Sequence, residues 1–149
     1  MNDVPGSRTD PAGIAFRLLE PGDEAVVREL ATYDGPGDPA GLLADPSTLL
    51  LVAFDGDRAV GFVLAHVLPR RHGDAAKLFV YELDVAETHR RRGVASALLE
   101  RLAGLARDRG IRSGFVLAEP GNHPANALYY SAGGASHPDV TWTFSYADD

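Results

Sequence analysis

Cysteine is absent from this sequence and basic residues are scarce, and each shortage excludes a class of function. With no cysteine, disulfide bridges, thiolate nucleophiles and zinc–thiolate sites are excluded. The 14 lysines and arginines are outnumbered by 21 acidic residues, which gives a net charge of −7. Proteins that bind nucleic acids are usually basic, so we expect no nucleic-acid partner.

Long apolar runs are missing as well. No run approaches the roughly 20 residues that cross a bilayer, so we expect no membrane partner. Residues 1–13 lack the apolar core of a signal peptide and predict a disordered N-terminal arm. The remaining residues, 14–149, are enough for one domain with a buried core. We expect this domain to be cytoplasmic.

One stretch, Lys77–Ala106, changes its apolar pattern part-way. Residues from Leu78 to Val85 are rich in β-branched and aromatic side chains, which predicts a buried strand. From Val94 onward, alanine and leucine recur at steps of three and four residues, which predicts an amphipathic helix. Gly110 is a natural stop for that helix.

The rest of the chain reads as alternating strands and helices around this unit. Asp55-Gly56-Asp57 is a strong hairpin signal, and Asp23 and Asp38 precede helices as N-caps. Further strands are predicted at Ile14–Leu19, Thr48–Phe54, Arg58–Val67, Arg112–Ala118 and Val140–Tyr146, and further helices at Glu24–Tyr33, Pro39–Ala44 and Pro124–Ala132. The order β-α-α-β-β-β-α-β-α-β indicates an α/β domain with a mixed, mostly antiparallel sheet. On the last strand, Trp142 and Phe144 are expected in the core, with a dimer seam as the alternative.

Between the central strand and its helix lies a basic turn, Arg90-Arg91-Arg92, followed by Gly93. A helix N-terminus presents unpaired N–H groups and a partial positive charge, which suit a phosphate. Gly93 and the small Ala95 allow close approach, and the arginines add charge-assisted donors. The turn therefore predicts a site for a di- or polyanion. The alternative is a solvated turn before an ordinary helix.

The segment Arg90–Ala95 resembles the Q/R-x-x-G-x-G/A signature of the GCN5-related N-acetyltransferases, and Asn122–Tyr129 is similar to that family's N-x-x-A-x-x-L-Y spacing. The likeness extends over about residues 14–146. It implies the fold of that family, with acetyl-CoA as cosubstrate, its pyrophosphate in the basic turn, and no metal. The coenzyme contacts that it implies fall on Leu83, Val85, Arg90, Arg91, Arg92, Gly93, Val94, Ala95, Ser96, Asn122 and Tyr129.

Acetyl transfer to an amine needs a group that takes a proton from the ammonium. Glu82 and Asp84 are two residues apart on the central strand and therefore share a face; Glu82 is the first choice as base. The alternative is that one of the two pairs with Arg90 or Arg112.

The resemblance also implies the other groups that take part in the transfer. It places Tyr129 beside the coenzyme sulfur, as general acid toward the departing thiolate. The alternative is that Tyr129 only packs against the sheet. The resemblance further implies free backbone groups at Leu83 and Val85, with an N–H at Val85 or its neighbour near the thioester oxygen.

The acceptor is suggested by a narrower likeness. Tyr81–Glu87, together with Pro124-Ala125 and Ala127-Leu128-Tyr129, resembles class I aminoglycoside 3-N-acetyltransferases of the gentamicin/fortimicin type. A small cationic amine, most simply an aminoglycoside acetylated at its 3-amino group, would be attracted by an acidic cleft. The substrate-binding residues expected there are Glu82, Asp84, Glu119, His123 and Asp139, although His123 could instead cap a helix.

Two departures count against that class. It tends to carry an aspartate pair where this chain has Asn122-His123, and its early acidic loop is longer than Ala31–Pro39. One alternative is therefore an acetyltransferase for another small amine or a protein N-terminus. A second is a non-catalytic acyl-CoA sensor. A homodimer is left open.

Overall fold

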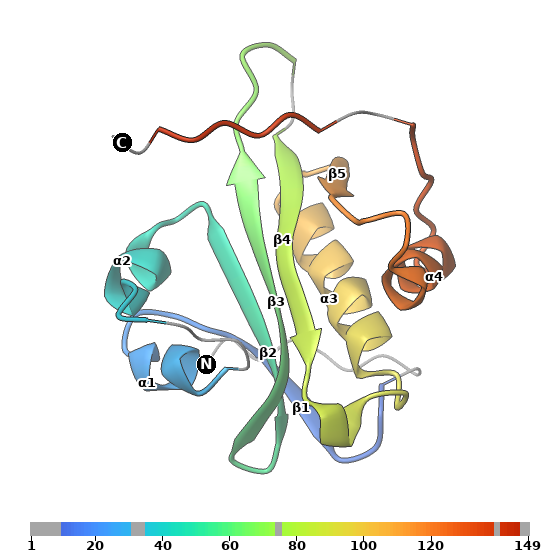
Figure 1. The fold of residues 1–149 in the computed structure, drawn as a ribbon. Helices are drawn as coiled ribbons and strands as arrows, with labels where there is room; N and C mark the ends of the chain where they lie inside the picture. Colours follow the sequence, from blue (N-terminus) through green and yellow to red (C-terminus); the bar gives the residue numbers. More distant parts are fainter. Residues whose placement is uncertain (1–9, 31–34, 74–75, 139–140, 147–149) are drawn as a thin grey trace.

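The computed structural model describes residues 10–30, 35–73, 76–138 and 141–146. Its core is one five-stranded sheet in the order β1-β2-β3-β4-β5 (Figure 1). Neighbouring strands are antiparallel except β4 and β5, which are parallel, so the predicted mixed sheet is confirmed. The strands are β1 Ile14–Leu18, β2 Thr48–Asp55, β3 Arg58–Leu68, β4 Lys77–Val85 and β5 Ser113–Val116.

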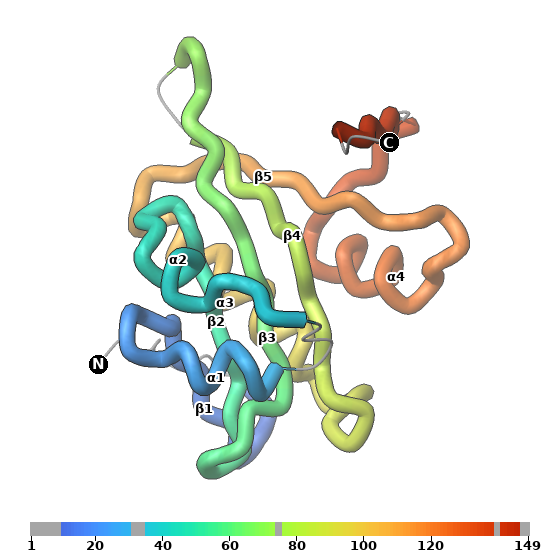
Figure 2. Tube along the Cα trace, turned by 60° about the vertical axis from the view of Figure 1, so that its left-hand side comes forward, coloured from blue at the N-terminus to red at the C-terminus, as the bar shows by residue number. Residues whose placement is uncertain are grey.

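Helices pack on both faces of this sheet (Figures 1 and 2). One apolar cluster joins α3 to residues such as Leu51 and Val63, and a second joins α1 and α2 to residues such as Leu50 and Val52. Adjacent strand residues thus serve opposite faces, as the pleat requires. The helices are α1 Glu24–Glu29, α2 Pro39–Ala44, the 3₁₀ turn η1 Glu87–His89, α3 Val94–Asp108 and α4 His123–Ser131. None of the described helices is long and apolar enough to cross a membrane.

The central strand β4 has an irregularity that sequence alone does not show. Leu64 pairs with Glu82 whereas Ala65 pairs with Val80, so Tyr81 is an extra residue in β4. Such a bulge bends a strand and increases its twist. On the other edge, β5 pairs with β4 only as far as Val80. In the described chain, the C-terminal part of β4, after Val80, therefore has no paired strand on the side of β5.

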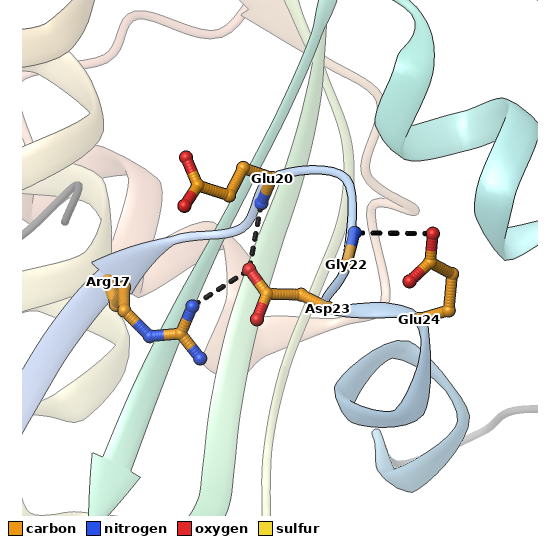
Figure 3. A network of polar contacts seen from close by, with 5 residues as sticks. All are labelled: Arg17, Glu20, Gly22, Asp23 and Glu24. Atoms are coloured by element: carbon orange, nitrogen blue, oxygen red, sulfur yellow. Dashed lines mark hydrogen bonds and ion pairs between the residues drawn. The ribbon is translucent and has the colours of Figure 1, made fainter.

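A polar turn fixes the entry to α1. Asp23 occupies the N-cap position but makes no side-chain bond to the helix. Its carboxylate instead accepts from the Glu20 backbone N–H at 2.9 Å and from the Arg17 guanidinium at 2.8 Å, while Glu24 accepts from the Gly22 N–H at 3.3 Å (Figure 3). Asp23 thus ties the end of β1 to the start of α1, a different role from the predicted cap.

The two short helices test the other predictions in this region. Asp38 caps α2 as predicted, because its side chain accepts from the Gly41 N–H at 3.0 Å. Helix α1 is shorter than the predicted range to Tyr33. It ends at Glu29 because Leu30 adopts an extended conformation, with φ −66° and ψ 147°.

The start of the described chain is more ordered than predicted. Asp10 falls within the arm expected to be disordered, yet its carboxylate pairs with Arg101 on α3. The Arg101 guanidinium carbon also lies 4.3 Å from the centroid of the Phe16 ring. This contact buries the arginine against β1 and places Asp10, a residue of the expected arm, beside α3.

The last predicted strand, Val140–Tyr146, is not formed in its described part, residues 141–146. Trp142 and Phe144 are 79% and 74% exposed, which contradicts the prediction that they lie in the core. The alternating pattern is present, but no strand of the described chain pairs with it. An alternating sequence pattern does not by itself supply a second strand with which the segment can pair.

Candidate active site

The separation of β4 from β5 opens a pocket of about 320 Å³. Strand β4 forms one wall, the end of β5 forms another, and α4 contributes a single side chain. The lining residues are Phe62, Val80, Tyr81, Glu82, Leu83, Asp84, Val116, Leu117 and Tyr129. The predicted base, its neighbouring carboxylate and the predicted acid therefore meet in one cavity, although they come from elements about 45 residues apart in the sequence.

Glu82 and Asp84 share a face of β4, as predicted, but their surroundings differ. The side chain of Glu82 is exposed and forms no hydrogen bond or ion pair with any described residue. The Asp84 carboxylate accepts the N–H of Val85 at 2.9 Å and lies 3.6 Å from the Arg90 guanidinium. The predicted alternative, an ion pair with an arginine, thus applies to Asp84 and leaves Glu82 available.

One hydrogen bond just beyond the end of β4 shows which way the backbone N–H and C=O groups of this strand point. The Ala86 N–H donates to the Val60 carbonyl at 2.8 Å. Hydrogen-bonded pairs alternate along an antiparallel ladder, and the register from Glu82 to Val85 is regular. Leu83 and Val85 therefore turn their N–H and C=O groups away from β3, toward the gap that β5 leaves.

The two backbone positions are not equivalent. The Val85 N–H donates to Asp84, and the Val85 carbonyl accepts from the Arg90 Nε at 3.0 Å. A side chain of its own turn therefore satisfies the N–H of Val85, one of the two backbone positions expected to face the coenzyme. Leu83 is the position in the pocket whose N–H stays directed at the gap.

Tyr129 lies in the second turn of α4 and lines the pocket. Burial raises the pKa of its phenol above the ordinary value of 10.0, because a phenolate would lose hydration there. The hydroxyl is therefore protonated at neutral pH, which is the form that a general acid requires.

The start of α4 is held by two asparagines. Asn122 caps the helix, since its Oδ1 accepts from the Ala125 N–H at 3.2 Å; His123, the cap considered in the sequence, is not the cap. The Asn126 Nδ2 donates to the carbonyls of Glu119 and Asn122, at 2.8 Å each. Sequence reasoning missed Asn126, because any asparagine in a first helical turn is an ambiguous signal.

Two of the five residues expected to bind the substrate, Glu82 and Asp84, line the pocket. Glu119 and His123 are exposed and neither lines the pocket. Asp139 lies outside the described residues. Glu82 and Asp84 are the acidic side chains that line the pocket in the described part of the chain.

The basic turn before α3 has the geometry of an anion site. Arg91 and Gly93 both adopt left-handed backbone conformations, with φ 60° and 80°. Within the described residues, no acceptor pairs with the backbone N–H of any residue from Arg91 to Ser96. Successive N–H groups in such a turn form a concave nest for anions, and a non-glycine residue at positive φ is often retained at a functional site.

The side chains around this nest divide into two kinds. Arg90, Arg91, Arg92 and Ser96 are exposed, whereas Val94 is 2% exposed. Val94 can therefore offer its N–H to a ligand but not its side chain, which anchors α3 on the sheet.

A buried histidine attaches this turn to the sheet. His89 is 7% exposed; its Nε2 lies 2.8 Å from the Asp55 carboxylate and its Nδ1 lies 2.8 Å from the Thr88 hydroxyl. The hydrogen bond from His89 lowers the pKa of Asp55 below the ordinary 3.8. Sequence reasoning missed this contact, because the two partners are 34 residues apart and no local pattern joins them.

Comparison with known proteins decides the family. Residues 14–133 match the model of the acetyltransferase (GNAT) family. The chain is a member of that family. The resemblance inferred from Arg90–Ala95 and Asn122–Tyr129 is thereby confirmed at the level of the family, and so is the α/β GNAT fold.

Individual relatives differ in their acceptors. The chain is 32% identical, over 79 residues, to the L-2,4-diaminobutyric acid acetyltransferase of Shouchella clausii (strain KSM-K16). The match spans 53% of this chain and 43% of that protein, so it reaches less than half of the relative's length.

Two solved structures resemble the chain over most of its length. An aminoglycoside acetyltransferase, HMB0005, from an uncultured soil metagenomic sample has a TM-score of 0.80 at 26% identity, covering 90% of this chain and 99% of that one. A ribosomal-protein-alanine N-acetyltransferase from Brucella melitensis biovar Abortus 2308 has a TM-score of 0.76 at 25% identity, with the same coverage. All three are acetyltransferases, and the 3-N class is not singled out.

Proposed function

We propose that this protein transfers the acetyl group of acetyl-CoA directly to a primary amine of a small cationic acceptor. The observation that carries the proposal is the pocket itself, in which Glu82 from β4 and Tyr129 from α4 line one cavity beside a gap in the sheet. A carboxylate and a protonated phenol in one water-accessible pocket are the pair of groups that this reaction needs.

The coenzyme fits the basic turn by its chemistry. The nest of N–H groups from Arg91 to Ser96 and the exposed guanidinium groups of Arg91 and Arg92 would hold the pyrophosphate. The Leu83 N–H would hold the thioester oxygen as negative charge develops on it. Asn122 would contact the pantetheine arm, since its Nδ2 donates to none of the described residues. When bound, the thioester supplies the acetyl group.

The chain's own residues then manage two protons. Glu82 takes one proton from the ammonium of the acceptor, which frees the nitrogen lone pair. The nitrogen would attack the acetyl carbonyl, the C–N bond forming as the C–S bond breaks, and would release its second proton to water. Tyr129 gives a proton to the departing sulfur. Asp84 keeps Arg90 and the turn in place. The protein holds no covalent intermediate in this scheme.

The finer proposal is an aminoglycoside acceptor, acetylated at its 3-amino group. Two observations support it: two carboxylates line the pocket, and a 26% identical relative is an aminoglycoside acetyltransferase. A second candidate is 2,4-diaminobutyrate, supported by the 32% identity to its acetyltransferase. A small diamine needs fewer carboxylates than a polycation, and Glu119 does not line the pocket.

Thiol release from acetyl-CoA tests these proposals. The purified protein is given gentamicin, 2,4-diaminobutyrate, spermidine or a peptide that begins with alanine, and the acetylated position is located by NMR. Turnover with gentamicin at its 3-amino group supports the finer proposal, and preferred turnover of diaminobutyrate supports the second. No thiol release with any amine, together with tight coenzyme binding by calorimetry, overturns the enzymatic proposal in favour of a sensor. With the best acceptor, Tyr129→Phe should lower kcat and leave coenzyme affinity unchanged; full activity would mean that Tyr129 only packs.

A further inference from the structure

The helix that carries Tyr129 has no buried side chain to attach it to the rest of the molecule. The two apolar clusters end, in sequence order, at Ile111 or before it. Helix α4 follows them, and none of its nine residues is buried. The chain reaches this helix through the loop 117–122, which follows β5 (Figure 2). Since no core fixes α4, its polar contacts with this loop set its position relative to β4.

One side chain joins the loop to the first turn of α4. The Asn126 Nδ2 donates to the carbonyls of Glu119 and Asn122, at 2.8 Å each. The Asn122 N–H also donates to the Glu119 carbonyl, at 3.0 Å. The segment 119–122 is therefore tied at both of its ends to a single amide group on the helix.

Asparagine is an unfavourable residue inside a helix, so its presence at position 126 needs a reason. It stabilises a helix by up to roughly 0.7 kcal/mol less than alanine does, because its side chain competes for backbone groups. Among short side chains, a primary amide offers two N–H donors from one atom, whereas a hydroxyl offers one donor. The two bonds of Asn126 use both of these donors on the loop. They favour a role in placing the helix over a role in stabilising it.

We propose that Asn126 is a positioning residue for acetyl transfer: its two bonds to the loop hold α4 so that the Tyr129 hydroxyl stays in the pocket that Glu82 also lines. This inference rests on the function proposed above, in which Tyr129 gives a proton to the departing sulfur. Tyr129 follows Asn126 by three residues, so the two side chains are neighbours on one face of α4. Tyr129 is further from the loop than Asn126 is. A tilt of α4 about the loop therefore displaces the phenol more than the amide.

The two asparagines of this region have separate roles. The Asn122 Oδ1 accepts from the Ala125 N–H at 3.2 Å, and this cap does not involve the side chain of Asn126. Loss of the Asn126 amide therefore leaves the cap of α4 in place. We expect it to alter the position of Tyr129 and to leave the coenzyme contact of Asn122 intact.

Steady-state kinetics with the acceptor that gives the fastest thiol release tests the role of Asn126. Asn126→Ala removes both donors, adds no charge and introduces the better helix former. The kcat should fall by about 10- to 100-fold, because a displaced acid is out of line with the sulfur. The KM for the acceptor, the coenzyme affinity by calorimetry and the stability by denaturant unfolding should not be reduced. Full kcat, or a raised acceptor KM in place of the lowered kcat, overturns the proposal.

Ser131 provides a matched control on the same helix. Its Oγ donates to the Leu128 carbonyl at 2.8 Å, a bond that lies within α4 and does not reach the loop. Ser131→Ala therefore removes a side-chain bond of the same length without releasing the loop, and it should leave kcat unchanged. An equal fall in kcat for Ser131→Ala and Asn126→Ala would show a general weakening of α4 and would overturn the specific role of Asn126.

The pH profile of kcat gives a readout that a purely structural role would not change. Burial raises the pKa of Tyr129 above 10.0. Release of α4 should hydrate the phenol and lower this pKa toward 10.0. The kcat of Asn126→Ala should therefore begin its alkaline fall at a lower pH than the kcat of the wild type. An unchanged alkaline limb would mean that the phenol has not moved, contrary to the proposal.

A double-mutant cycle shows whether Asn126 acts through Tyr129. Residues that act as a unit have non-additive effects, so Asn126→Ala with Tyr129→Phe should have the kcat of Tyr129→Phe alone. Additive losses would place the effect of Asn126 elsewhere and overturn the proposal. Full activity of Tyr129→Phe would contradict the acid role in the proposed function. A normal loss for Tyr129→Phe with no effect of Asn126→Ala would contradict the positioning role alone.

Discussion

Glu82 and Asp84 show how two identical functional groups on one strand acquire different roles. Both carboxylates line the pocket. Asp84 is held by the Val85 N–H and lies near the Arg90 guanidinium, whereas Glu82 has no partner among the described residues. Asp84 is thus engaged with its own turn, whereas Glu82 is open to a ligand in the pocket. This difference supports the proposal of Glu82 as the base, with Asp84 positioning the turn that follows β4.

The first prediction separates these two roles by kinetics. Glu82→Gln removes the base, so kcat should fall by about 10²–10⁴ with coenzyme affinity unchanged. The loss should shrink as pH rises, because hydroxide then deprotonates the amine. Asp84→Asn, the matched control, should mainly raise KM for acetyl-CoA, because it releases Arg90. Steady-state rates across pH measure both, and a larger fall in kcat for Asp84→Asn would reverse the assignment.

At the scale of elements, the periodicity of apolar residues predicts a helix or strand when that element depends on its own sequence. The apolar alternation of β4 and the three- and four-residue steps of α3 are properties of each segment alone, so both elements were predicted nearly to their ends. The bulge at Tyr81 depends on how β4 aligns with β3, and no pattern within β4 reveals it. The strand at 141–146 failed for the same reason, because pairing needs a partner that the segment does not specify.

The site was predictable to the extent that it lies on motifs. Glu82, Tyr129 and the turn at Gly93 are found from a strand pattern and two short spacings. The contact between His89 and Asp55, which anchors that turn, joins residues 34 positions apart. Glu119 was placed in the cleft by charge alone, and it does not line the pocket. Three-dimensional neighbours that share no local signal are the part that sequence reasoning cannot supply.

The second prediction concerns the contact between β3 and the start of α3. A Cβ added at Gly61 would lie 3.2 Å from the Val94 Cγ1 and 3.3 Å from the Asp84 carbonyl oxygen. Gly61→Ala should therefore destabilise the fold by about 1–3 kcal/mol, as overpacking does. Gly104→Ala, in open space on α3, should stabilise it by about 0.5–1 kcal/mol. Denaturant unfolding measures both, and a neutral Gly61→Ala would mean that α3 shifts freely.

The third prediction uses the contact between Asp55 and His89. The pKa of Asp55 is lowered in the fold from 3.8, so its contribution to stability is complete above that value and is lost as pH falls through the lower, folded value. Asp55→Asn should therefore reduce Tm at pH 7, and the difference from wild type should vanish near the folded pKa.

Its second readout is the coenzyme, because η1 leads into the basic turn. Asp55→Asn should raise KM for acetyl-CoA at pH 7. Asp57→Asn, across the same hairpin turn, is the control and should change neither quantity. A Tm difference that persists unchanged below pH 3 (about one unit under the ordinary pKa) would show that the effect is not electrostatic.

On the scale of the whole molecule, the packing is uneven in a way that suits the chemistry. Two apolar clusters fill both faces of the sheet from β1 to the start of β5. Beyond Ile111 the chain packs loosely, and the pocket lies at this boundary. The pocket forms where the firmly packed part of the chain ends. Residues up to Ile111 supply Glu82, and the loosely packed residues after it supply Tyr129. The residues up to Ile111 must therefore keep their fold without support from the residues after it.

One ion pair joins the start of the described chain to helix α3, within the packed part of the molecule. Arg101 on α3 and Asp10 are 5% and 15% exposed in their side chains, and the guanidinium also covers the Phe16 ring. Asp10→Ala removes a carboxylate from beside the buried guanidinium, so it should destabilise the fold, by up to about 3 kcal/mol. Adding Arg101→Met should recover much of that loss, because the apolar side chain suits Phe16 and no charge remains buried. Denaturant unfolding measures both variants. A single variant within about 0.5 kcal/mol of wild type would mean that the pair behaves as an exposed one, and that β1 and α3 are held together by the apolar cluster alone.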